Sequence, residues 1–116
     1  MYVPNNIAPL YNKALLNLST NPDSSLFYFL NCLKINDCPL VNWQVGNILM
    51  QKQDKRVLHY YIKAYPGFSK DPRFLNSLVV ANLVNQNKPG ARQILNELVA
   101  LDPGNSNIPR LRAAVK

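Results

Sequence analysis

A helical pattern that recurs at a spacing of about 34 residues constrains the fold of this chain more than any other feature of its sequence. Residues 45–64 contain an apolar helix, a short polar turn and a second apolar helix, and residues 79–98 repeat the arrangement. A single helical hairpin of this kind has no second layer on which to bury its apolar face. The sequence therefore predicts stacked hairpins that share one continuous core.

The length and apolar content of the chain fit one such stack. Its 116 residues are 47% hydrophobic, which is enough for a packed core but short for a second domain. We expect a single all-α domain over residues 1–116, a right-handed helical-hairpin solenoid of about three helix pairs. The expected hairpins cover residues 7–35, 39–66 and 71–102, and a capping helix is expected at residues 106–116.

Polar residues and prolines mark the expected helix ends. Asp23 or Ser24 is a candidate N-cap for the second helix, and Asp71 stands before a proline at the start of the fifth. Pro66-Gly67 is expected to end the fourth helix, because proline removes a hydrogen-bond donor and glycine permits a left-handed exit.

Two segments of the chain resemble the tetratricopeptide repeat (TPR) family. Val45-Gly46-Asn47-Ile48-Leu49 and Tyr60-Tyr61-Ile62-Lys63-Ala64 match the family pattern of small residues early in each helix and large ones between them. The segment from Val79 to Pro103 matches it again and ends in the Leu-Asp-Pro typical of the repeat. The first hairpin carries the pattern as Ser25, Phe29 and Cys32. The resemblance implies close backbone packing at Gly46, Ala64 and Ala91.

The resemblance also implies that the first helix of each hairpin lines a concave groove. The expected contact residues are Tyr11, Leu15, Trp43, Asn47, Met50, Gln51, Phe74, Ser77, Ala81 and Asn85. An alternative is that the aromatic members, Tyr11, Trp43 and Phe74, belong to the core between helices. Trp43 is expected to be more than half buried, between the first and third hairpins.

Some family members hold the terminal carboxylate of a peptide with lysine, arginine and asparagine on these helices. Here Tyr11 and Leu15 are expected at places where that clamp needs lysine and asparagine, so no clamp is expected. The predicted surface is aromatic and aliphatic with scattered amides. Such a surface suits an amphipathic helix or an extended apolar segment of a partner protein.

The net charge of +7 favours a partner with acidic flanks. Nucleic acid is the less favoured partner, because the basic residues are dispersed and no aromatic-interleaved basic stripe is present. Exposed apolar ends of a short solenoid also make a homo-oligomer possible.

Residues that could carry catalysis are scarce. His59 is the only histidine, the two cysteines have no histidine nearby, and the four glycines form no phosphate-binding loop. We therefore expect no enzyme activity, no cofactor and no metal. The start of the chain lacks a signal-peptide layout and no apolar run is long enough to span a membrane, so a cytoplasmic location is expected.

The leading hypothesis is a non-catalytic protein-interaction module. A sharper alternative is a dedicated chaperone of a bacterial secretion-system subunit, because small three-hairpin members of the family have about this length. The second alternative is an RNA-binding helical-repeat protein.

Overall fold

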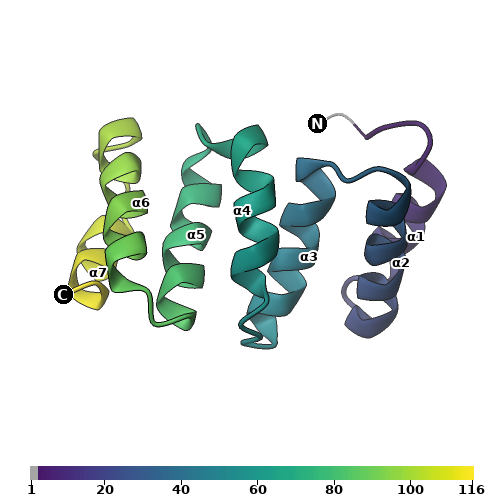
Figure 1. Ribbon diagram of the computed structural model, residues 1–116, viewed down its shortest axis with the longest axis horizontal. Coiled ribbons are helices and arrows are strands. Elements are labelled where there is room, and N and C mark those ends of the chain that lie inside the picture. Colours follow the sequence, from purple (N-terminus) through teal and green to yellow (C-terminus); the bar gives the residue numbers. More distant parts are fainter. Residues whose placement is uncertain (1–2) are drawn as a thin grey trace.

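The computed structural model describes residues 3–116, and the only regular elements among these residues are α-helices. Figure 1 shows them in chain order: α1 (Ala8–Asn17), α2 (Pro22–Ile35), α3 (Pro39–Gln51), α4 (Val57–Phe68), α5 (Pro72–Val84), α6 (Lys88–Leu101) and α7 (Ile108–Ala114). The first six pair into three hairpins, and α7 packs against α6. The all-α hairpin solenoid expected from the sequence is confirmed.

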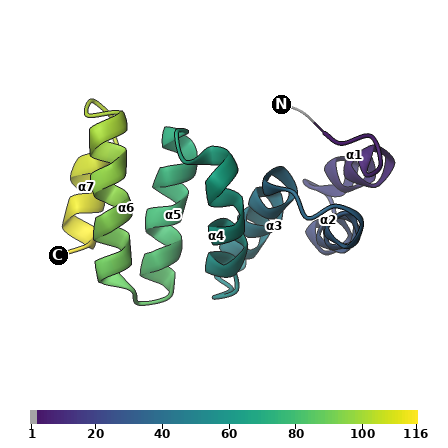
Figure 2. The same ribbon diagram turned by 45° about the horizontal axis from the view of Figure 1, so that its top comes forward.

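The hairpins form an elongated stack. Each helix packs mainly against its neighbours in the chain, and the molecule measures 42 × 25 × 21 Å along its principal axes. In Figure 2, α1 and α2 are seen almost end-on while α5 and α6 are seen from the side, so the hairpin axes rotate along the stack. No helix within residues 3–116 is long and apolar enough to cross a membrane.

Each paired helix contributes at least three buried positions to the core, spaced i, i+4 and i+7 on one helical face, when Ile7, the N-cap of α1, is counted with its helix. In the first helices these are Ile7, Tyr11 and Ala14, then Val41, Val45 and Ile48, then Phe74, Leu78 and Ala81. In the second helices they are Ser25, Phe29 and Cys32, then Val57, Tyr61 and Ala64, then Ala91, Leu95 and Leu98. This set includes both expected alanines. The buried Ser25 hydroxyl donates to the carbonyl of Ala14 at 2.7 Å.

From the second hairpin to the third, equivalent buried residues are 33 positions apart in the first helices and 34 positions apart in the second helices. The second helices keep the spacing expected from the sequence, with Val57 equivalent to Ala91. The buried residues of α3 and α5 align in a register that is shorter by one residue, with Val41 equivalent to Phe74. Both helices are followed by a glutamine with positive φ, Gln53 at 53° and Gln86 at 57°, and these two glutamines align in the same shorter register.

The longer register, which pairs Val45 with Val79, is therefore wrong for α5. The difference arises because one extra residue lies in the chain between Gln86 and Ala91.

Helix α4 continues through Pro66 and Gly67 to Phe68, so the predicted helix end at Pro66-Gly67 is wrong. Gly67 does not adopt a positive φ. A Cβ atom there would lie 2.7 Å from the Cβ atom of Pro39, so this glycine permits close approach of the chain at the start of α3. The ring of Phe68 packs on Trp43 with centroids 4.5 Å apart, which helps to offset the helical hydrogen bond that Pro66 removes.

Side chains at the helix starts partly follow expectation. Asn21, rather than Asp23 or Ser24, caps α2, because its side-chain oxygen accepts from the backbone N–H of Ser24 at 3.2 Å. Asp71 caps α5 as expected, accepting from the backbone N–H of Arg73 at 2.9 Å. Either kind of side chain satisfies an N–H group that has no partner within the helix.

Candidate functional site

Three of the ten residues predicted to line a groove are buried in the core. Tyr11 is 6% exposed, and Phe74 and Ala81 are 0% exposed. Tyr11 packs edge-on against Phe29, and Phe74 packs edge-on against Trp43. The prediction that Tyr11, Phe74 and Ala81 present a binding surface is wrong. For Ala81 the cause is the register, because the longer register pairs it with Asn47, and an error of one residue turns a helix by about 100°.

The shorter register identifies the outward positions of α5 that the sequence reasoning missed. The residues equivalent to Asn47, Met50 and Gln51 are Val80, Leu83 and Val84. All three are partly exposed. The glutamine turns after α3 and α5, and the prolines that begin both helices, carry this spacing in the sequence. They are the signal from which the correct positions could have been found.

Met50 and these three residues line an open apolar groove between α3 and α5, with a volume of about 510 Å³. Gln53 and Lys55, from the loop after α3, form its polar edge. We call this site the α3–α5 groove. Its floor is apolar, and its edge carries the amide of Gln53 and the ammonium group of Lys55. Gln51 is exposed next to it in the chain but is not part of its lining.

Three other predicted contact residues are committed to hydrogen bonds within the fold. The hydroxyl of Tyr61 donates to Oδ1 of Asn47 at 2.5 Å. The amide of Asn85 donates to the carbonyls of Lys55 and Ala81, each at 3.1 Å, and so ties the loop after α3 to α5. The hydroxyl of Ser77 donates to a carbonyl of its own helix. These side chains position the groove more than they line it.

Trp43 is more than half buried, as expected, but the aromatic rings that it contacts lie on α4 and α5. It packs on Phe68 and Phe74, and the guanidinium of Arg73 lies 5.9 Å from its ring centroid. The expected packing against the third hairpin is confirmed by the contact with Phe74. Its Nε1 donor and the Oδ1 acceptor of Asn76, at the equivalent position of α5, are buried without a partner among residues 3–116.

The outward face of α1 also differs from the prediction. Its buried residues align with those of α3, so the positions equivalent to Asn47 and Met50 are Lys13 and Leu16. Leu16 is 79% exposed and Leu15 is 41% exposed. Tyr11 and Leu15 are therefore not the positions of α1 that correspond to Asn47 and Met50.

The charged groups near the groove leave one cation without an acidic partner. Lys52 pairs with Asp23, and Arg56 forms a bidentate pair with Asp54. Hydrogen bonds from Arg56 lower the pKa of Asp54 to about 2. No carboxylate within residues 3–116 pairs with Lys55. The α3–α5 groove therefore has a positively charged edge.

Neither metal ligands nor reactive thiols gather at this site. Within residues 3–116 no group of three or more histidine, cysteine, aspartate or glutamate side chains is placed to hold a metal ion. Cys32 and Cys38 are free thiols. Burial raises the pKa of Cys32, which keeps its thiol protonated.

Comparison with known proteins identifies the fold. No family model matches the chain, and no curated protein matches it. Among solved structures, it is similar to the first TPR domain of Spaghetti (RPAP3), determined with the HSP90 peptide SRMEEVD bound. The TM-score is 0.80 at 13% sequence identity, and the match covers 98% of this chain and 94% of the other. The chain therefore has a TPR-like fold.

Proposed function

We propose that this chain is a non-catalytic protein-interaction module that binds an apolar or amphipathic partner segment with an acidic flank. One observation carries the proposal. Outward positions that are equivalent in the three hairpins hold the exposed or partly exposed apolar residues Leu16, Met50 and Leu83, which lead into the α3–α5 groove. A row of apolar side chains at equivalent places of successive repeats offers one continuous surface to a bound chain.

The distribution of charge supports the acidic flank. Lys13 on α1 and Lys55 beside the groove place ammonium groups next to the apolar row, and the chain as a whole carries a net charge of +7. In α5 the residue equivalent to Lys13 is the apolar Val80, and the residue equivalent to Gln51 is the apolar Val84. Positive groups therefore lie toward the first two hairpins and apolar groups toward the third, which suits a segment whose acidic residues adjoin an apolar residue.

The fold comparison supports a protein partner. The similar TPR domain of Spaghetti was solved with SRMEEVD, a peptide in which methionine precedes two glutamates and an aspartate. That peptide contains both an apolar residue and adjoining acidic residues, the two kinds of group that the proposal requires. It is therefore a suitable first probe for this chain.

The test is a fluorescence-anisotropy titration of labelled SRMEEVD, followed by selection of tighter heptapeptides from a random phage library. Met50→Asp should reduce the affinity of SRMEEVD and of the selected peptides at least about tenfold, because it places an unpaired carboxylate in the apolar groove. Asn96→Asp adds the same charge at an exposed position of α6 and is the matched control. Peptides that bind Met50→Asp and the parent chain equally would place the site elsewhere.

The chaperone alternative is a finer form of the same proposal, in which the bound segment is an apolar helix of a secreted subunit. It predicts that selected sequences show apolar residues at helical spacing. RNA binding is tested separately by filter binding. Affinity for RNA that is tighter than micromolar and falls steeply with salt would replace the peptide proposal.

A further inference from the structure

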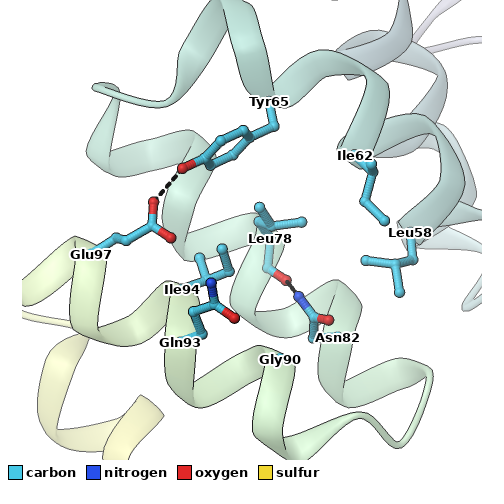
Figure 3. Close-up of a pocket in the computed structure, with 9 residues that line it drawn as sticks. All are labelled: Leu58, Ile62, Tyr65, Leu78, Asn82, Gly90, Gln93, Ile94 and Glu97. Atoms are coloured by element: carbon cyan, nitrogen blue, oxygen red, sulfur yellow. Dashed lines mark hydrogen bonds between the residues drawn. The ribbon is translucent and has the colours of Figure 1, made fainter.

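A second pocket lies between the second helices of the last two hairpins, with α5 as its floor. Figure 3 shows that α4 and α6 form its walls. Its volume is about 300 Å³. The residues that line it are Leu58, Ile62, Tyr65, Leu78, Asn82, Gly90, Gln93, Ile94 and Glu97. None of them lines the α3–α5 groove, so this α4–α6 pocket is a separate site.

Gly90 lets the start of α6 pack closely against the floor of the pocket. A Cβ atom at Gly90 would lie 2.6 Å from Oδ1 of Asn82 and 2.5 Å from Nδ2 of Asn87. The floor amide of Asn82 is already paired, since its Nδ2 donates to the carbonyl of Leu78 at 2.9 Å and its Oδ1 accepts from Asn87 at 3.1 Å. Because the amide of Asn82 is already hydrogen-bonded, a ligand is expected to bind through the apolar walls and through Glu97, the charged residue of the lining.

The walls expose apolar area that the fold does not use. Ile62 is 58% exposed on α4, and Leu58 and Ile94 are partly exposed. These residues lie outside the three buried positions of their helices. An exposed isoleucine beside two partly exposed aliphatic residues provides a place where one apolar side chain of a partner loses its contact with water.

One end of the pocket carries an unneutralised carboxylate. Glu97 is the only glutamate of the chain, and no cation within residues 3–116 pairs with it. Tyr65 points toward it across the end of the pocket and donates its hydroxyl proton to Oε1. That hydrogen bond raises the pKa of Tyr65. A hydroxyl leaves the negative charge of Glu97 in place and holds it in one position.

We propose that the α4–α6 pocket is a second docking site, which takes an apolar side chain next to a lysine or arginine of a partner protein. The apolar side chain lies against Ile62, Leu58 and Ile94, and the cation pairs with Glu97. This preference is opposite in charge to that of the α3–α5 groove. The volume is at the lower end of the range for ligand pockets, so the site reads a short motif and not a whole helix.

The test uses acetyl-Leu-Arg-amide as the probe and acetyl-Leu-Glu-amide as its charge-reversed control, titrated into ¹⁵N,¹³C-labelled protein at low salt. The arginine peptide should shift the methyl signals of Ile62 and Ile94 and the amide signal of Gly90. It should bind about two- to fivefold more tightly than the glutamate peptide, as expected for one partly exposed ion pair. The preference should shrink as salt is added.

Two variants separate the charge from the apolar contact. Glu97→Gln can still accept the hydroxyl hydrogen bond of Tyr65, so it should abolish the preference for arginine and retain the packing. Ile62→Ala should weaken both peptides about equally. Ile35→Ala is the matched control, because Ile35 is 52% exposed and lies outside the pocket. Far-UV circular dichroism should show the same fold for all three variants.

Four outcomes would overturn the proposal. These are equal affinity for the two peptides, a preference that survives Glu97→Gln, an Ile35→Ala effect as large as that of Ile62→Ala, and shifts confined to Met50 and Leu83. The spectra are also recorded without peptide at two protein concentrations. Concentration-dependent signals of Ile62 and Ile94 would identify a second copy of the chain as the occupant instead.

Discussion

The backbone of Gly46 on α3 lies directly against the ring of Tyr61 on α4. A Cβ atom at Gly46 would be 2.2 Å from Cε1 of that ring. The ring has little room to move, because Tyr61 is buried and its hydroxyl donates to Oδ1 of Asn47. The close packing that the sequence predicted at Gly46 is thus confirmed, and the residue that requires it is identified.

Gly46→Ala should therefore destabilise the chain by about 1–3 kcal/mol, although alanine is the better helix former by about 1 kcal/mol. Urea unfolding followed by circular dichroism measures the effect. Gly104→Ala is the matched control, because nothing lies within 4 Å of a Cβ atom built there, and its effect should stay within about 0.5 kcal/mol. A Gly46→Ala protein as stable as the parent would mean that Tyr61 can shift.

Tyr61 should give the unfolding free energy a dependence on alkaline pH. Burial raises the pKa of Tyr61 from 10 to about 12, so the folded state favours the protonated phenol. The contribution is fully present below pH 10 and is lost as the pH rises through about 12, and its upper limit is about 2–3 kcal/mol. Urea unfolding at pH 9, 10, 11 and 12 should show a smaller decline for Tyr61→Phe. Identical declines in both proteins would contradict the assignment.

Asp71 should make the opposite contribution at acid pH. Hydrogen bonding to Arg73 lowers the pKa of Asp71, so its stabilising effect is present above the ordinary pKa near 4 and is lost as the pH falls below it. Asp71→Ala should cost about 0.5–2 kcal/mol at pH 7, because the N-cap of α5 is lost. Asp71→Asn can still cap the helix and should remove part of the acid dependence with a smaller loss at pH 7.

The shorter register predicts different roles for Phe74 and Leu83. Phe74 is completely buried, so Phe74→Ala should cost about 3–5 kcal/mol and leave little folded protein at 37 °C. Leu83 is only partly buried at the groove, so Leu83→Ala should cost about 1 kcal/mol. Thermal unfolding of both variants measures the difference. A Leu83→Ala protein as unstable as Phe74→Ala would favour the longer register instead, because that register pairs Leu83 with the buried Leu49.

Leu16 tests whether the binding surface extends to α1. Because Leu16 is 79% exposed, Leu16→Asp should fold normally and weaken SRMEEVD binding, measured by fluorescence anisotropy. Phe27→Asp makes the same kind of change at a 61% exposed residue of α2 and should leave the affinity unchanged. Equal effects of the two variants would indicate that added negative charge alone repels the acidic peptide.

The sequence was sufficient for the fold and insufficient for the site, and α5 shows why. The run from Leu78 to Leu83 includes only one polar side chain, Asn82. An apolar face is therefore present in either the shorter or the longer register, and periodicity alone cannot select between them. The extra residue lies between Gln86 and Ala91, at the start of α6, so it does not change the apolar pattern of α5.

The α4–α6 pocket was not predicted because it arises between helices. Gly90 of α6 packs closely on Asn82 of its floor, and Glu97 of α6 accepts a hydrogen bond from Tyr65 of α4. These residues come together only because α4 and α6 lie on either side of α5 in the folded chain. A lone exposed isoleucine such as Ile62 is an ordinary surface residue in the sequence.

Trp43 is the only tryptophan of the chain, and its ring is held where the end of α4 meets the start of α5. In a stack whose helices touch mainly their neighbours, α1 and α2 can melt while that junction stays intact. The tryptophan fluorescence of this protein therefore reports unfolding of the second and third hairpins only. Loss of helical ellipticity at temperatures where the emission is still native would be the optical signature of a solenoid that frays from its N-terminal end.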